Sequence, residues 1–275
     1  MEFFTILLSG LLAVLSPVNL VADKVTEGAI RSRFNKVEQL KVRIDNAPNY
    51  QLVQGKVERV RIAGRGVWLT PDIRIDALEL ETDPLNVDLQ RLRAGSQGSP
   101  RASLRQPIQA GVRLVLTESD LNKALASPNV AARLKIIGSR ALGGSPERYE
   151  FINPKIELLG SNRLRFQVEV QEKDAQPLAL IVESGLNIVS GRSLQVVEPV
   201  VSVNGKPLSS LLVAAFTRGI SNGFNLRTLE ERGITARFLQ FKVDKGELDI
   251  AAFVRVDAAK PIALLTTGAS TLRTD

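Results

Sequence analysis

Apolar and polar residues alternate along much of this chain, and this pattern limits the fold more than any other feature. Leu164, Phe166, Val168 and Val170, for example, alternate with charged or amide side chains. Such a period of two is typical of a strand with one face on a core and the other in water. The pattern predicts strands at residues 40–44, 57–62, 73–80, 112–116, 164–170, 178–189, 194–203, 234–243 and 248–256. The last two should form a hairpin, because the turn residues 244–246 join them.

Residues 207–224 break the alternation and predict a long helix. Its apolar residues recur at helical spacing and form one broad stripe. Pro207 fits a first helical turn, where its missing N–H costs nothing. A helix this apolar is usually buried, so we expect sheet to pack around it. The same residues suit a filled core or one side of a lipid groove, and the pattern does not separate the two.

Shorter helices are expected after the strand at residues 112–116. Thr117 is a plausible N-cap, and Glu118 and Asp120 suit the positive end of a helix. Ser127 and Pro128 mark a second helix start. The chain is therefore expected to be an α+β protein, with a strongly curved antiparallel β-sheet wrapped around a long helix and preceded by an N-terminal hydrophobic helix.

The composition excludes several classes of chemistry. The chain has no cysteine and no histidine, which removes thiolate nucleophiles, the usual zinc ligands and every Ser-His triad. No acidic cluster has the spacing of a metal-binding loop. We therefore expect no catalytic residue, no metal and no cofactor. Aromatic residues make up only 5% of the chain, too few for base stacking, so nucleic acid is not an expected partner.

The N-terminus carries twenty uncharged residues, 3–22, which is long enough to cross a bilayer as a helix. Glu2 stands where a signal peptide would have a basic residue, so cleavage is not favoured. A spanning anchor, an interfacial helix and an uncleaved signal-like segment remain open. The predicted anchor residues are Phe3, Phe4, Leu7, Leu8, Leu11 and Leu12.

The net charge of +7 is concentrated just after this segment. Residues 24–65 contain ten basic and four acidic residues, which gives +6. This excess suits an anionic membrane surface, although a solvated face of an ordinary strand pair would look the same. The predicted membrane-surface residues are Lys24, Arg31, Arg33 and Lys36. The positive-inside rule would place the body on the cytoplasmic side.

Six short motifs occur in a fixed order and spacing over roughly residues 24–257. These are residues 27–30 (EGAI), 46–48 (NAP), 51–55 (QLVQG), 116–122 (LTESDLN), 203–205 (VNG) and 226–229 (LRTL). In these motifs the chain resembles the LmeA-like phospholipid-binding family, most closely its cyanobacterial members. Lipoprotein members carry an anchoring cysteine that this chain lacks, so its apolar segment would have to hold it on the membrane.

The resemblance implies a non-enzymatic phospholipid carrier of the cell envelope or thylakoid membrane with a tubular lipid-binding type of fold. The lipid would lie in an apolar groove between curved sheet and helix. The residues predicted to line that groove are Leu121, Leu125, Leu164, Phe166, Leu211, Leu212, Ala215, Phe216 and Phe238. The alternative is a membrane-associated scaffold or accessory factor with a filled core. The expected organisation is an anchor at residues 1–23, one domain at 24–257 and a disordered tail at 258–275.

Overall fold

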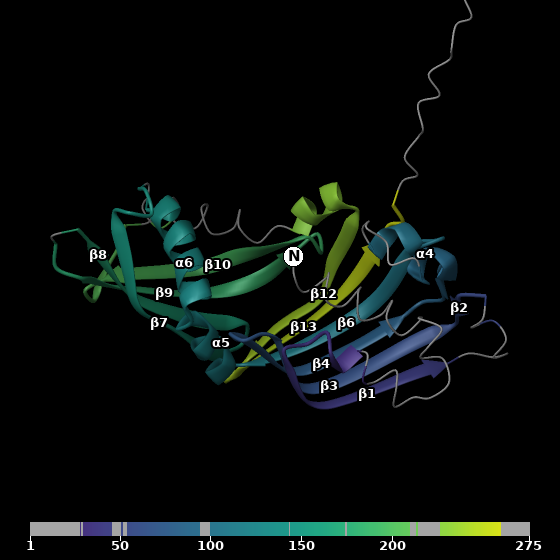
Figure 1. Ribbon diagram of the computed structural model, residues 1–275. Coiled ribbons are helices and arrows are strands. Elements are labelled where there is room, and N and C mark those ends of the chain that lie inside the picture. The colour runs from purple at the N-terminus through teal and green to yellow at the C-terminus, as the bar shows by residue number, and fades with distance from the viewer. Residues whose placement is uncertain are drawn as a thin grey trace, which may run out of the picture.

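The computed structural model describes residues 28, 30–45, 51, 54–93, 100–142, 144–173, 175–209, 213 and 226–259. Within them the protein is mostly antiparallel β-sheet with few helices (Figure 1), which confirms the expected α+β class. Two open sheets lie end to end. The helices and 3₁₀ turns lie beside them.

The first sheet has six strands in the order β1-β3-β4-β6-β13-β12. Their bounds are β1 (Lys36–Asp45), β3 (Arg59–Thr70), β4 (Ile73–Thr82), β6 (Ile108–Thr117), β13 (Glu247–Val256) and β12 (Ile234–Asp244). A short pair, β2 (Lys56–Val57) and β5 (Leu85–Asn86), adjoins it. One face of this sheet carries the larger core, in which Val60, Val67 and Leu78 are each 0% exposed.

The second sheet has five strands in the order β11-β10-β9-β8-β7. Their bounds are β11 (Lys206–Pro207), β10 (Ser193–Val203), β9 (Leu178–Val189), β8 (Arg163–Glu172) and β7 (Tyr149–Gly160). A smaller core with Val168, Val182 and Val201 covers one face. We call the core-bearing faces of the two sheets the inner face. Among the residues that the structure describes, the two cores are separate clusters.

The turns of the second sheet join it to β12 of the first. Asn162 exchanges two hydrogen bonds with Val243: its N–H donates to the Val243 carbonyl at 3.1 Å, and its Oδ1 accepts from the Val243 N–H at 2.9 Å. Further along β12, the Phe238 N–H donates to the Gly191 carbonyl at 2.7 Å. The outer edge of β12 is thus covered by hairpin turns, as an unpaired strand edge requires.

Within the described residues, the helical elements with defined bounds are α4 (Leu89–Arg93), η1 (Pro100–Ser103), α5 (Glu118–Leu125), α6 (Pro128–Ala141) and η3 (Leu226–Arg232). As expected, Thr117 caps α5, since its side chain accepts a hydrogen bond from the Asp120 N–H. Helix α6 approaches β7 closely, because a Cβ added at Gly138 would lie 2.4 Å from the ring of Phe151. Gly138 therefore permits this close packing.

The predicted start of the long helix is wrong. Pro207 lies in β11, where Lys206–Pro207 pairs with the end of β10. Of residues 207–224, the structure describes 207–209 and Val213, which is helical. The rest of that predicted helix and the whole N-terminal segment lie outside the described residues, as do residues 260–275. Among the described residues, no helix has the length and apolarity needed to span a bilayer.

Candidate functional site

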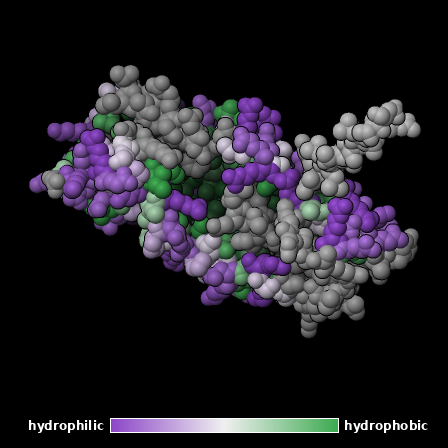
Figure 2. All heavy atoms as spheres, turned by 45° about the horizontal axis from the view of Figure 1, so that its top comes forward, coloured by the Kyte–Doolittle hydropathy of each residue, from purple (hydrophilic) through white to green (hydrophobic). Residues whose placement is uncertain are grey.

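Between the two cores, the inner face carries apolar side chains that are only half-buried. We call them the inner-face band. From the first sheet it contains Leu114, Leu116, Phe238, Phe241, Ile250 and Ala252, and from the second Ile156, Leu164 and Phe166. Figure 2 shows hydrophobic atoms at the bottom of a hollow near the middle of the molecule. Half-buried apolar groups in a hollow are a feature of binding sites for apolar ligands.

Strand register brings the members of the band together. Leu114 pairs with Ile250, which pairs with Phe241 in the next strand. Two residues along the sheet, Ala252 pairs with Phe238. A bulge between Phe238 and Gln240 keeps both phenylalanines on the inner face, and their rings meet edge to face at 6.3 Å.

In the second sheet the band follows β7 and β8. Ile156 pairs with Phe166, and Phe166 pairs with Val182 of the smaller core. Leu164 lies two residues earlier on the same face of β8. The band is therefore continuous with both cores and fully covered by neither.

Helix α5 is fixed to the β7 edge beside the band. The Asn122 side chain donates to the Ile156 carbonyl and accepts from the Ile156 N–H, both at 2.8 Å. Glu118 accepts from the Leu158 N–H at 2.8 Å. These side chains satisfy strand-edge groups that would otherwise lack a partner in the fold.

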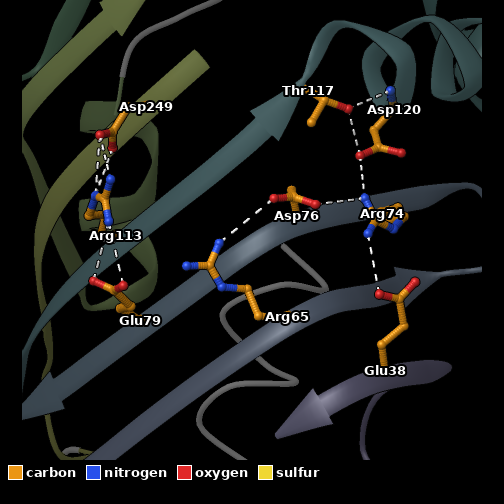
Figure 3. Close-up of polar contacts among 9 residues, drawn as sticks. All are labelled: Glu38, Arg65, Arg74, Asp76, Glu79, Arg113, Thr117, Asp120 and Asp249. Carbon is orange, nitrogen blue, oxygen red and sulfur yellow. Dashed lines mark hydrogen bonds and ion pairs between the residues drawn. The ribbon is translucent and has the colours of Figure 1, made fainter. Parts of the chain in front are cut away.

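An ion-pair network fixes α5 to the first sheet (Figure 3). Asp120, whose side chain is 3% exposed, lies 2.6 Å from Arg74 of β4 and also accepts from the Thr117 hydroxyl at 2.8 Å. Arg74 additionally pairs with Asp76 and Glu38. Burial lowers the pKa of Arg74, but the carboxylates, Asp120 first, outweigh it and raise that pKa overall. This arginine therefore stays charged and acts as a structural anchor.

The structure describes five of the nine predicted groove residues. Leu164, Phe166 and Phe238 belong to the inner-face band. Leu121 and Leu125 are half-buried on α5. Leu211, Leu212, Ala215 and Phe216 lie outside the described residues.

Only some of the predicted membrane-contacting residues are among those that the structure describes. Arg31, Arg33 and Lys36 are exposed, although the Arg31 guanidinium donates to the Val37 carbonyl and the Lys36 ammonium lies 4.8 Å from the Trp68 ring centre. Lys24 lies outside the described residues, and so do the predicted anchor residues Phe3, Phe4, Leu7, Leu8, Leu11 and Leu12.

Sequence reasoning missed the other members of the band. The alternation at residues 112–116 and 248–256 predicts that Leu114, Leu116 and Ile250 face the core. It does not show that these side chains are only half-buried. Ile156 was missed because β7 was not predicted. Phe241 lay within a predicted strand, and only its pairing with Ile250 identifies its side of the sheet.

A second hollow, of about 700 Å³, lies on the opposite, polar face of the first sheet. Its floor includes the small residues Ala63, Gly111 and Ala251. Its cations are largely compensated: Arg113 pairs with Glu79 and Asp249 (Figure 3), and Arg61 pairs with Asp45. This balance of charge gives no reason to assign an anionic ligand to the outer hollow.

The part of the chain that the structure describes holds no group of three or more acidic side chains placed to bind a metal ion. Comparison with known proteins points instead to lipid. The sequence model of the LmeA-like phospholipid-binding family matches residues 13–253. No curated protein and no solved structure matches the chain.

Proposed function

This chain belongs to the LmeA-like phospholipid-binding family, and from that premise we propose that it is a non-enzymatic phospholipid carrier. Its acyl chains would lie along the inner-face band between the two cores. The two sheets would then form part of a tubular enclosure for them.

The observation that supports this proposal is the gap between the two cores. Leu78 and Val168 are buried on either side of it, whereas the apolar band between them stays half-exposed. An acyl chain would remove this surface from water, and each of its buried methylene groups contributes about 0.8 kcal/mol. A single saturated or unsaturated chain could thus bind without any specific polar contact.

Charge supports a membrane as the source of the lipid. The chain has a net charge of +7, and Arg31, Arg33 and Lys36 are exposed beside the first strand. Each basic residue near an anionic leaflet contributes about 1 kcal/mol. We place the protein on the cell-envelope or thylakoid membrane, held there by residues 3–22.

Native mass spectrometry after gentle extraction tests the proposal. The full chain is stripped of lipid and then offered phosphatidylglycerol, its lysolipid or glycerophosphate. We expect both acylated ligands to remain bound and glycerophosphate to be lost, because the band offers apolar contact. A chain that carries no lipid from cells and takes up none would contradict the proposal and favour a scaffold with a filled core.

A further inference from the structure

Helix α6 has an exposed side that carries both large apolar and basic residues. Ile136 and Ile137 are 40% and 57% exposed, and Arg133 is exposed on the same side of the helix. Leu142, directly after the helix, is also exposed. The opposite side faces β7, where Gly138 approaches Phe151 and Ser139 is buried. The two isoleucines therefore leave a large part of their apolar surface in water on the side of α6 away from β7.

The charge of α6 indicates what kind of surface would cover these isoleucines. Its sequence contains Arg133, Lys135 and Arg140 and no carboxylate. Glu147 lies near enough to Lys135 to interact with it electrostatically. A helix with isoleucines among basic residues, and no acid of its own, is complementary to an anionic bilayer, in which the apolar groups enter the acyl boundary and the cations meet phosphates.

We infer that α6 is the surface by which this protein docks on an anionic bilayer. The inference rests on the proposed function, since docking would bring the inner-face band to its source of lipid. Helix α6 packs on β7, the strand that contributes Ile156 to the band, at the end of the molecule away from β1 (Figure 1). A bilayer touching α6 would thus lie beside the sheet that contributes Ile156, Leu164 and Phe166 to the proposed lipid site.

The lack of cysteine in the chain permits a site-specific test in the full-length protein. Ile137→Cys is labelled with an environment-sensitive fluorophore and reconstituted in phosphatidylglycerol-containing vesicles whose acyl chains carry nitroxide quenchers. Leu239→Cys in β12 is the matched control, since Leu239 is also a large exposed apolar residue, at 67%. We expect quenching at position 137 to exceed that at position 239 by about threefold or more, because only α6 would enter the acyl boundary.

Charge provides a second readout. Adding Arg133→Glu to the Ile137→Cys protein should lower its ratio of docked to undocked molecules by about fivefold or more. Vesicles of phosphatidylcholine alone should give the same loss. Equal quenching at positions 137 and 239, or none at 137, would overturn the inference.

Bound lipid is measured by mass spectrometry on the same samples, so that the two proposals can fail separately. Lipid-loaded protein without docking through α6 would contradict this inference and leave the carrier function intact. Docking through α6 by a protein that never holds lipid would contradict the carrier function.

Discussion

Asn122 of α5 satisfies both backbone groups of Ile156, donating to its carbonyl and accepting from its N–H at 2.8 Å each. One side-chain amide thus takes the place of a neighbouring strand at the free edge of β7. The contact also fixes α5 beside the inner-face band. A helix residue therefore both protects a sheet edge and fixes α5 beside the candidate site.

Replacing this amide should destabilise the fold. Asn122→Ala leaves two partly buried backbone groups without their partner, at an expected cost of about 1–3 kcal/mol in the free energy of unfolding. Asn187→Ala, at an exposed position of β9, should change it by less than about 0.5 kcal/mol. Urea unfolding of the two variants measures the difference. Equal losses would show that the Asn122 bonds contribute nothing specific.

The two kinds of inner-face leucine should respond differently to truncation. Leu78→Ala removes a fully buried side chain and should cost about 2–5 kcal/mol. Leu164→Ala removes a half-buried one and should cost clearly less in lipid-free protein, because water already reaches its surroundings. Chemical unfolding of both lipid-free variants provides the comparison. A cost at Leu164 as large as that at Leu78 would indicate a filled core.

Lowering the pH should reduce the stability of the second sheet, because Glu183 becomes protonated and its ion pairs are lost. Its hydrogen bond with Arg165, followed by one with Arg163, lowers the pKa of Glu183 below its ordinary value despite some burial. A carboxylate with a lowered folded-state pKa stabilises the fold above its unfolded pKa, about 4.3, and this contribution disappears as pH falls through the folded pKa. Glu183→Gln should therefore be less stable than wild type at pH 7 and more nearly equal to it at pH 3.

The matched control for this pH dependence is Glu231→Gln, at an exposed position of η3. It should track wild type at both pH values in thermal unfolding. A stability difference for Glu183→Gln that stays constant from pH 7 to pH 3 would contradict the assignment of the Glu183 ion pairs.

Alternation predicted most strands correctly because one face of each is buried. The hairpin of β12 and β13 follows its turn signal, and Gly246 adopts the positive φ, +78°, that such a turn favours. Strand β7 was missed because Asn153 and Pro154 interrupt its alternation. Asn153 has a φ of +51° at a shift in register. The strand therefore continues through residues whose local sequence is typical of a turn.

A local hairpin explains the error at Pro207, whereas pairing between strands distant in sequence explains the gaps in the predicted site. Pro207 suits a helix start, but the partner that places it in a strand, Ser202, is contributed by β10. For the site, alternation identified Leu164 and Phe166 as facing inward. It could not show that they are half-exposed, because a core and a groove use the same residues and exposure depends on strands distant in sequence.

The most direct test of the carrier function compares two neighbouring alanines of β13. Ala252 faces the inner-face band, where it pairs with Phe238, whereas Ala251 pairs with Gln240 on the opposite face. Bound phospholipid is measured by native mass spectrometry on Ala252→Trp and Ala251→Trp, with thermal unfolding to verify that both fold. We predict that Ala252→Trp loses bound phospholipid and Ala251→Trp keeps it, because only the first indole fills the band. Undiminished lipid in a folded Ala252→Trp protein would contradict the proposed site.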